Sequence, residues 1–302
     1  MVAQMVAALA VALSLSLRGL HKRSLSPSGA VAAFVVGSLH MACGLPFGAT
    51  LIAFYLTSSK LTKWRGDLKA RLEEGHVAGG QRGASQVLAN SALGASLAAA
   101  AAWFGGGSGG GAAAAALLPL IPPAFVGFYA CCCSDTYSSE VGIAAARPPR
   151  LVTSLRRVPP GTNGAVSTLG LAAAAAGGAL VGLVYCGAAA LQQAVAETNG
   201  AGAGAAVSPG ADWRLLPLAV CAGLAGSLVD SLLGATLQWS GHDVRSGRAV
   251  SGRLPAGSAG GAGVEHVCGI DLLSNTQVNV VSSALTSLLA AAAWHRWVAD
   301  SM

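Results

Sequence analysis

The sequence predicts an all-α polytopic integral membrane protein, a single helical bundle over residues 1–302 with about seven to eight transmembrane helices. Of its residues, 53% are hydrophobic and only 10% are charged, whereas a typical soluble domain carries roughly 25% charged residues. The mean hydropathy is +0.60. Ala- and Gly-rich apolar runs alternate with short polar loops along the chain. Together these observations indicate several membrane crossings within one membrane domain.

Eight apolar runs are the expected spans, and they cover residues 1–17, 29–43, 46–57, 87–104, 112–130, 165–190, 215–238 and 278–294. The basic residues near the first run follow it, so we interpret it as a span and not as a cleavable signal peptide. The second and third runs are shorter than the ~20 residues that a straight span needs. Gly44-Leu45-Pro46 separates them, so they form either a tight helical hairpin or one kinked segment. In the fifth run, Pro122 and Pro123 are expected to kink or interrupt the helix.

The segments between these runs are polar or rich in glycine. Residues 63–74 carry several charges and are expected to form a surface helix. The Gly105–Gly111 run ends the fourth span, and a Gly/Ala linker at 198–211 precedes the seventh. A hydrophilic, Gly-rich loop separates the last two spans.

Basic residues are distributed unevenly among these loops. With eight spans, four loops lie on one side of the membrane, namely residues 18–28, 57–86, 134–163 and 239–275. These loops hold 16 of the 18 Lys and Arg residues, and the other side keeps only Arg214 and Arg296. Cytoplasmic loops carry the excess of Lys and Arg in membrane proteins. We therefore expect the four loops in the cytosol and the N-terminus outside, which supports two crossings by residues 29–56.

Composition and motifs exclude several other classes of protein and site. The seven cysteines show neither paired metal-ligand spacing nor a disulfide framework. The net charge of +6 is spread over loops and not gathered in one arm, so no nucleic-acid partner is expected. There is no Walker A motif, and Gly105–Gly111 lacks the Lys-Ser/Thr ending of a phosphate-binding loop. The lipid bilayer is the expected partner.

The polar segment Ser134–Glu140 follows a long apolar run. It places two carboxylates, those of Asp135 and Glu140, among hydroxyl side chains. Ionisable groups at the margin of a membrane span are costly, so they are candidates for function. The structural alternative is a helix N-terminus with Ser134 or Asp135 as its cap.

A second polar cluster lies at the cytosolic end of the seventh span. Asp230, Gly234 and Gln238 recur at i, i+4 and i+8, so one helix face is small and polar. Asn275 and Asn279 likewise share a face at the start of the last span, with a plain helix cap as the alternative for Asn275. Asp230 is expected about two turns inside the apolar span, where an unpaired carboxylate is costly.

Two carboxylates with amide and hydroxyl neighbours, facing the compartment that contains nucleotide, suit a Mg²⁺–phosphate site. Phosphoryl transfer at such a site needs mainly positioning and charge neutralisation. Backbone N–H groups of Gly161, Thr162, Asn163 and Gly164 could cradle a phosphate, although this tetrapeptide is also typical of a plain turn. The candidate counter-charges are Lys60, Lys63, Arg82, Arg156 and Arg157. A carboxylate buried for ion transport is the alternative for Asp230.

Six blocks of sequence resemble a known family over nearly the whole chain. They are the Ser- and Lys-bearing segment 58–63, the segments 79–83 and 86–90, the acidic segment 135–142, the glycine segment 158–167 and the polar helix 226–238. In this order they resemble the domain-of-unknown-function 92 family of integral membrane proteins. That family includes transmembrane protein 19 of animals and the phytyl-phosphate kinases of plastids.

The resemblance implies a kinase that converts an isoprenoid monophosphate of the phytyl type to the diphosphate, with a nucleoside triphosphate as donor and Mg²⁺ as cofactor. Carried over residue by residue, Asp135 and Asp230 are the candidate catalytic residues, and with Glu140 they are candidate Mg²⁺ ligands. Thr162, Asn163, Gln238 and Asn279 are the implied polar lining of the phosphate site. Asn163 is closer to the transmembrane protein 19 branch, because an acidic residue is expected there in the plastid kinases.

A second function stays open at this point. The chain could be a non-enzymatic transporter or a lipid or ion carrier, in which Asp135 and Asp230 bind a cation or a proton. Small-residue spans pack tightly in either case and do not discriminate between the two functions. The sequence shows no Arg- and Ser-rich transit peptide, which favours an endomembrane over the plastid envelope.

Overall fold

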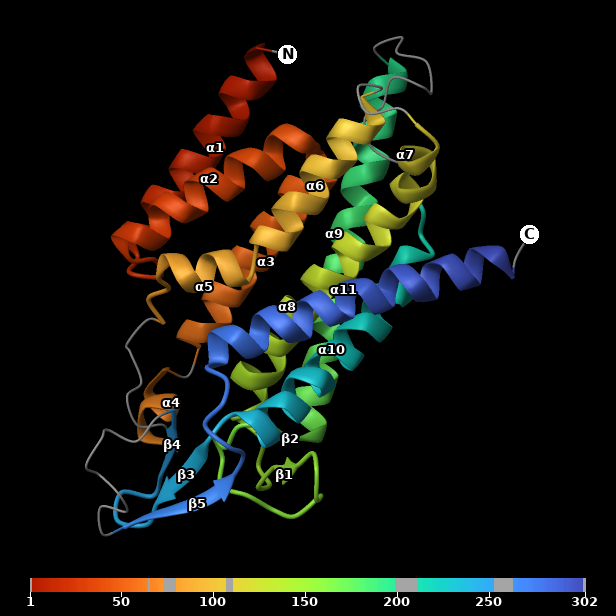
Figure 1. Cartoon of the computed structure of the whole chain (residues 1–302). Coiled ribbons are helices and arrows are strands. Elements are labelled where there is room, and N and C mark those ends of the chain that lie inside the picture. The colour runs from red at the N-terminus through yellow and green to blue at the C-terminus, as the bar shows by residue number, and fades with distance from the viewer. Residues whose placement is uncertain are drawn as a thin grey trace.

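The computed structural model describes residues 2–64, 66–72, 80–106, 111–198, 211–252 and 263–300. The helices of these residues are α1 (Val2–His21), α2 (Pro27–Cys43), α3 (Leu45–Lys63), α4 (Gly66–Leu72), α5 (Ala84–Ala89), α6 (Ala92–Gly105), α7 (Ala112–Leu117), α8 (Ile121–Gly142), α9 (Thr168–Thr198), α10 (Leu215–Leu237) and α11 (Asn275–Ala299). The 3₁₀ turn η1 (Leu118–Leu120) joins α7 to α8. The strands are β1 (Arg150–Leu151), β2 (Ala165–Val166), β3 (Ser240–Asp243), β4 (Arg248–Ser251) and β5 (Val264–Cys268), and they gather at one end of the helices (Figure 1).

Four segments of the described chain are long and apolar enough to cross a membrane. They are Ala114–Gly142, which runs through α7, η1 and α8, and the helices α9, α10 and α11. The apolar segments Met5–His21, Pro27–Cys43 and Ala92–Gly105 are shorter. The structure therefore supports a helical membrane protein, but the described helices do not support seven to eight full-length spans.

The second and third expected spans are two separate helices and not one kinked segment. α2 begins after Ser26, whose side chain accepts a hydrogen bond from the Gly29 N–H. Pro27 occupies its first turn, where a missing N–H costs nothing. Gly44 ends α2 with φ +146°, a conformation that glycine adopts readily. α3 then continues to Lys63, beyond the end expected at residue 57.

The acidic segment is the last part of a helix and not the start of a loop. α8 runs to Gly142, well past the end expected at residue 130. Ser134 and Asp135 therefore lie inside a helix, and the interpretation of either residue as a helix N-cap is wrong. The run 112–130 is interrupted directly before Pro122 and Pro123, as expected, because α7 ends at Leu117 and the 3₁₀ turn η1 precedes α8. The two prolines occupy the first turn of α8, where proline is tolerated.

Other boundaries also differ from the expected ones. The expected span 87–104 is divided into α5 and α6 by a turn at Asn90. Of the charged surface helix expected at 63–74, the structure shows α4, while residues 65 and 73–79 lie outside the described residues. Parts of the expected glycine run and of the Gly/Ala linker, residues 107–110 and 199–210, also lie outside them.

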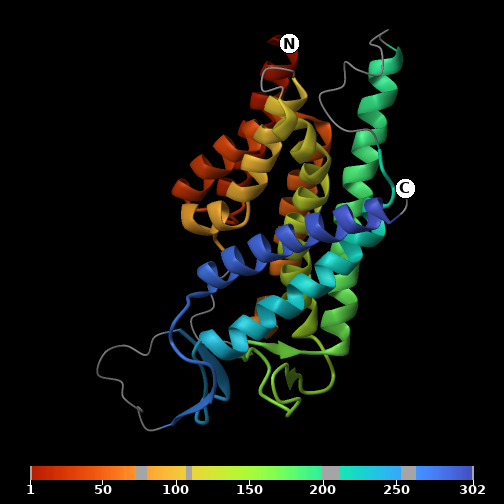
Figure 2. The same cartoon turned by 45° about the vertical axis from the view of Figure 1, so that its right-hand side comes forward.

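Helix α8 is the centre of the bundle. Every residue from Ile121 to Ser134 is buried, and α3, α6, α9, α10 and α11 all pack against α8 (Figure 2). The ring of Phe125 contacts the ring of Phe47 with centroids 4.8 Å apart. Small residues bring the helices close together. A Cβ at Gly178 of α9 would lie 2.4 Å from the Ala219 carbonyl oxygen of α10, so this close approach requires glycine.

Two small antiparallel sheets lie beyond the end of the bundle. β1 pairs with β2, with Leu151 opposite Ala165. The other sheet has the order β4-β3-β5. Because β3 follows α10 and β5 precedes α11, this sheet connects the polar ends of the two helices.

Candidate functional site

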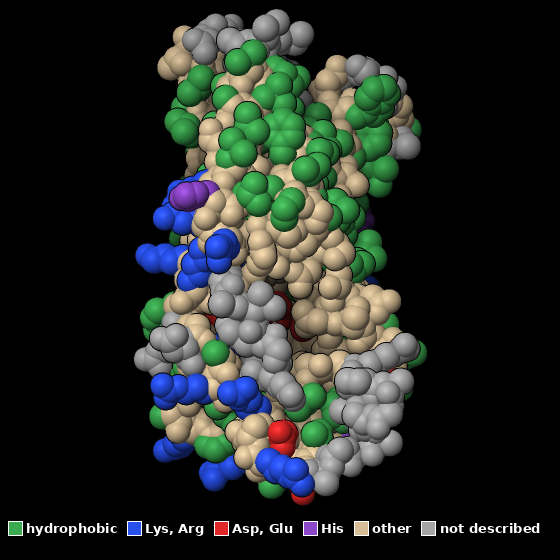
Figure 3. Space-filling view, turned by 90° about the vertical axis from the view of Figure 1, so that its left-hand side faces the viewer, with side chains coloured by type: hydrophobic (Ala, Val, Ile, Leu, Met, Phe, Trp, Pro, Cys, Tyr) green, Lys and Arg blue, Asp and Glu red, His purple; other side chains and the backbone are tan. Residues whose placement is uncertain are grey.

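A polar cavity of about 850 Å³ lies where the last turns of α8 and α10 meet the start of α11 and the segments around residues 80–90 and 160–167. In Figure 3, acidic side chains are visible inside a hollow below the largely apolar upper half of the molecule. On the face that Figure 3 shows, Lys and Arg side chains lie along the left-hand side and at the bottom. The cavity thus lies between the apolar part of the bundle and its polar end.

Asp135 of α8 and Asp230 of α10 meet in the wall of this cavity. Their carboxyl groups lie within hydrogen-bonding distance of each other. Two ionised carboxylates in contact repel each other strongly. The pair therefore requires a shared proton or a bound cation.

Hydroxyl groups join the helices around the pair. The i, i+3 spacing places Asp135 and Ser138 on one face of α8, and Ser227 and Asp230 on one face of α10. The Oγ atoms of Ser138 and Ser227 are 2.9 Å apart and form a hydrogen bond. Ser282 of α11 donates its hydroxyl to Asp230 Oδ2 at 2.9 Å. Hydrogen bonds thus link α8, α10 and α11 beside the two carboxyl groups.

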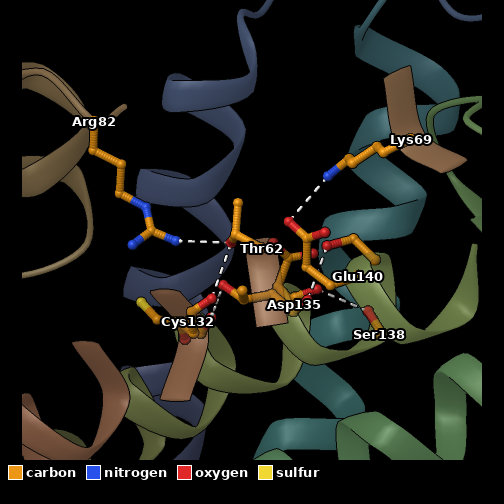
Figure 4. Close-up of polar contacts among 10 residues, drawn as sticks. Thr62, Lys69, Arg82, Cys132, Asp135, Ser138 and Glu140 are labelled. Carbon is orange, nitrogen blue, oxygen red and sulfur yellow. Dashed lines mark hydrogen bonds and ion pairs between the residues drawn. The ribbon is translucent and has the colours of Figure 1, made fainter. Parts of the chain in front are cut away.

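Glu140 pairs with a cation and not with the two aspartates. Lys69 Nζ donates to Glu140 Oε1 at 3.0 Å (Figure 4), and the exposed fractions of the two side chains are 17% and 7%. This ion pair ties the short helix α4 to the end of α8. Within the described residues, no three His, Cys, Asp or Glu side chains are close enough together to hold a metal ion. The structure therefore does not bring Glu140 into one ligand group with Asp135 and Asp230.

Arg82 supplies a second cation to the cavity wall. Its guanidinium donates to the Thr62 hydroxyl at 3.3 Å (Figure 4) and to the Ser59 hydroxyl, also at 3.3 Å. Within the part of the chain that the structure describes, it forms no ion pair with a carboxylate. Burial lowers the pKa of Arg82, and the negative charge of Glu140 opposes this change. Arginine nonetheless stays protonated in proteins, so Arg82 carries a positive charge that the protein only partly compensates.

The glycine segment 161–164 docks against the end of α10. Gly164 has φ +73°, and a Cβ there would lie 2.4 Å from both the Ser231 carbonyl oxygen and the Ala235 side chain. Both observations require glycine at this position. The segment therefore contacts α10 directly after Asp230.

Only part of the expected phosphate cradle is free. The Thr162 N–H donates to a carbonyl oxygen of its own turn at 3.3 Å, and the Asn163 N–H donates to Ser240 Oγ at 3.2 Å. The N–H groups of Gly161 and Gly164 form no hydrogen bond with any other described residue. The hydrogen bonds thus leave at most two of the four amide groups for a ligand.

The start of α11 contributes amide side chains. Ser274 is the N-cap and forms a capping box with Gln277, so the interpretation of Asn275 as the helix cap is wrong. Asn279 lines the cavity, and its buried Oδ1 has no hydrogen-bond partner within the described residues. Gln238, at the end of α10, is buried and lines the same cavity.

The cavity collects most of the site residues expected from the sequence, namely Asp135, Glu140, Gly161, Thr162, Asn163, Gly164, Asp230, Gln238 and Asn279. The expected counter-charges that lie outside it are Lys60, Lys63, Arg156 and Arg157. Lys63 Nζ instead donates to a backbone carbonyl of the turn between α1 and α2 at 2.7 Å. Lys69, Arg82 and Arg147 are the basic side chains that line the cavity. Sequence reasoning missed Lys69, because a lysine on a short charged helix is usually solvated.

The oxygen groups of the cavity fit one Mg²⁺ ion only in part. Mg²⁺ usually keeps several waters and binds one or two carboxylates together with phosphate oxygens. Asp135 and Asp230 would supply the carboxylates, and the unpartnered Oδ1 of Asn279 is a further oxygen in the same cavity. The remaining ligands would be water and the phosphates of a substrate.

Comparison with known proteins identifies relatives over most of the chain. Residues 10–287 match the family described as Integral membrane protein DUF92. The chain is 36% identical to Protein PGR of Arabidopsis thaliana over 290 residues, which are 95% of this chain and 94% of that protein. It is 32% identical over 111 residues to an uncharacterized membrane protein of Methanocaldococcus jannaschii, which covers 36% of this chain and 37% of that protein. No solved structure matches the chain.

Proposed function

The chain belongs to the DUF92 family of integral membrane proteins, and on this premise we propose that it is a membrane-embedded isoprenoid-phosphate kinase. Its substrates are an isoprenoid monophosphate of the phytyl type and a nucleoside triphosphate, and its lipid product is the diphosphate. The observation that carries the proposal is the contact between Asp135 and Asp230 in a cavity that also holds the only partly compensated positive charge of Arg82. Carboxylates that bind a metal, together with cations that bind phosphate, are what phosphoryl transfer requires.

The reaction requires little acid–base chemistry from the protein. A phosphate oxygen of the lipid attacks the γ-phosphorus of the nucleotide, a new P–O bond forms, and the nucleoside diphosphate leaves. Because the second pKa of a phosphate monoester is about 6, the attacking group is already largely ionised at neutral pH. The protein must therefore bring two anions together and neutralise their charge.

Different residues of the cavity bind the two anions and neutralise their charge. Asp135 and Asp230 would hold Mg²⁺, which neutralises phosphate charge when bound. Arg82 and Lys69 offer positive charge in the cavity wall, and Glu140 holds Lys69 in position. The free N–H groups of Gly161 and Gly164 bind phosphate oxygens. Asn279 and Gln238 add polar contacts.

One observation also favours a transporter or an ion or lipid carrier. A pair of carboxyl groups held between packed helices is also what a cation or proton site in a membrane requires. The two functions differ in their products, because a carrier moves its ligand without changing it.

The test is a conversion assay with purified protein in liposomes. Radiolabelled phytyl or geranylgeranyl monophosphate is supplied with Mg²⁺ and, separately, with ATP, CTP, GTP or UTP. We expect labelled diphosphate with at least one nucleotide, and none when EDTA removes Mg²⁺. If no nucleotide gives a product while the same liposomes show protein-dependent proton or cation flux, the carrier function replaces the kinase.

A further inference from the structure

A second hollow lies among α1, α2, α3 and α5, and Arg82 lines both this hollow and the polar cavity. It is small, with a volume of about 90 Å³. Its walls are almost entirely apolar and include Val11, Ala33, Leu51 and Phe54. Among its lining residues, all of which the structure describes, Arg82 is the only one with a charged side chain. We call this hollow the apolar groove.

The apolar groove and the polar cavity share a wall. Arg82, Gln86 and Asn90 line both. These residues belong to the segment that leads into and through α5. A ligand in the groove therefore has its inner end beside the polar cavity.

The backbone fixes Arg82 at this junction. Its N–H donates to the Ser24 carbonyl oxygen, and its own carbonyl accepts from the Ser26 N–H, both at 3.0 Å. Its guanidinium contacts the hydroxyl groups of Ser59 and Thr62 and, within the described residues, no carboxylate. Arginine presents a fork of N–H donors that matches phosphate geometry. The boundary between apolar and polar space thus carries a charge complementary to a phosphate.

We propose that the apolar groove binds the hydrocarbon tail of the lipid monophosphate, and that Arg82 binds its phosphate at the entrance to the polar cavity. This inference rests on the proposed function and specifies how the lipid substrate is oriented. The small volume of the groove admits one chain and excludes a bulky diacyl lipid. Val11 lines the groove and is 37% exposed, so the groove opens on the surface of α1, where the rest of a long tail continues among membrane lipids.

Photolabelling tests the orientation without any turnover. The probe is farnesyl monophosphate that carries a diazirine at the end of its tail, irradiated with the protein in liposomes and without nucleotide. We expect label on peptides of α1, α2 and α3, and we expect excess geranylgeranyl monophosphate to compete for it while inorganic phosphate does not. Label confined to α9, α10 or α11 overturns the proposal.

Two tryptophan variants of α2 provide a matched pair. Ala33→Trp fills the apolar groove, and we expect it to reduce labelling about tenfold or more, since steric loss of a few methylene contacts has effects of this size. Val35 of the same helix is 58% exposed and lies outside the groove. Val35→Trp should therefore leave labelling unchanged. Undiminished labelling of both variants contradicts the proposal. An equal loss of labelling in both variants, when each protein is folded, also contradicts it.

Arg82 variants separate the headgroup from the tail. We expect Arg82→Gln to weaken competition by geranylgeranyl monophosphate about tenfold or more and competition by geranylgeraniol hardly at all, because one charge-assisted phosphate contact is lost. Labelling in α1–α3 with no kinase product would refute the kinase and keep the lipid site. Kinase product with labelling elsewhere would refute the lipid site alone.

Discussion

The Asp135 carboxyl group of α8 contacts the Asp230 carboxyl group of α10, and Ser282 of α11 donates a hydrogen bond to Asp230 at 2.9 Å. Helix packing alone does not require this contact, because two apolar residues of similar size would avoid the repulsion. A polar group that is costly for the fold and lies in a cavity is typical of a functional site. The contact is therefore the centre of the kinase proposal.

Replacing either aspartate by asparagine should abolish turnover and leave the fold intact. Asp135→Asn and Asp230→Asn each remove one of the two carboxylates but keep its size and one oxygen. We expect kinase activity to fall by more than the roughly 10- to 100-fold that results when a residue that only orients a metal ligand is lost. Initial rates at saturating Mg²⁺ and thermal unfolding in detergent provide the measurement.

Asp212→Asn is the control for these variants, because Asp212 lies outside the cavity and its replacement changes the net charge equally. It should retain activity. Full activity in both cavity variants would remove the metal-site hypothesis.

The ion pair between Lys69 and Glu140 should act as a unit. Their side chains are largely buried, so removal of one leaves the other charge without its partner. We expect Lys69→Met and Glu140→Gln each to reduce activity, and the double variant to lose less than the sum, with a coupling of about 1–3 kcal/mol.

The Mg²⁺ dependence of the same variants decides the role of Glu140. If Glu140 only positions Lys69, Glu140→Gln leaves the half-saturating Mg²⁺ concentration unchanged. A several-fold increase in that concentration would instead make Glu140 a metal ligand, as the family resemblance implies.

Hydropathy and charge predicted the membrane class, because both depend on composition and not on contacts. The cost of intramembrane charge also drew attention to Asp135 and Asp230. The continuation of α8 to Gly142 was not predictable, because its last turns are polar and resemble a loop. Those turns are polar because they line the cavity and not lipid. The pairing of Lys69 with Glu140 depends on a long-range contact that no local pattern encodes.

Gly164 should tolerate no side chain. Its φ of +73° and the short distances that an added Cβ would have to Ser231 and Ala235 predict that Gly164→Ala displaces the glycine segment from α10. We expect a loss of about 1–3 kcal/mol of unfolding free energy and a larger proportional loss of activity.

The control is Gly187→Ala in α9, where an added Cβ meets nothing within 4 Å. Alanine has the higher helix propensity, so this variant should be as stable as the wild type or more stable. Equal stability of the Gly164 variant would show that the segment moves freely.

The salt bridge before α10 should give a pH-dependent contribution to stability. Hydrogen bonds from Arg214 lower the pKa of Asp212, and the Arg214 guanidinium also lies over the Trp294 ring of α11 at 5.1 Å. A lowered pKa in the folded state means that the stabilisation is fully present above the pKa of the unfolded chain, about 3.9, and is lost as the pH falls through the folded value.

Asp212→Asn should therefore lower the Tm at pH 7 by roughly 1–2 °C, since exposed ion pairs contribute little. The difference from wild type should vanish at acidic pH. A Tm difference that is constant from pH 7 to pH 3 would contradict the linkage.

Asn279 should support kinase activity and lower the stability of the fold. Its Oδ1 is buried in the cavity wall without a partner in the described residues, and an unsatisfied buried acceptor costs about 1–3 kcal/mol. Asn279→Leu should therefore raise the Tm and reduce kinase activity at least about tenfold, because the ligand oxygen is lost.

Ser38→Ala is the control. It removes another buried oxygen without a partner in the described residues, which lies on α2 outside both hollows. It should raise the Tm and leave activity unchanged. If Asn279→Leu behaves like Ser38→Ala in both measurements, the unsatisfied oxygen has no role in the site, and the lining assigned to α11 is only structural.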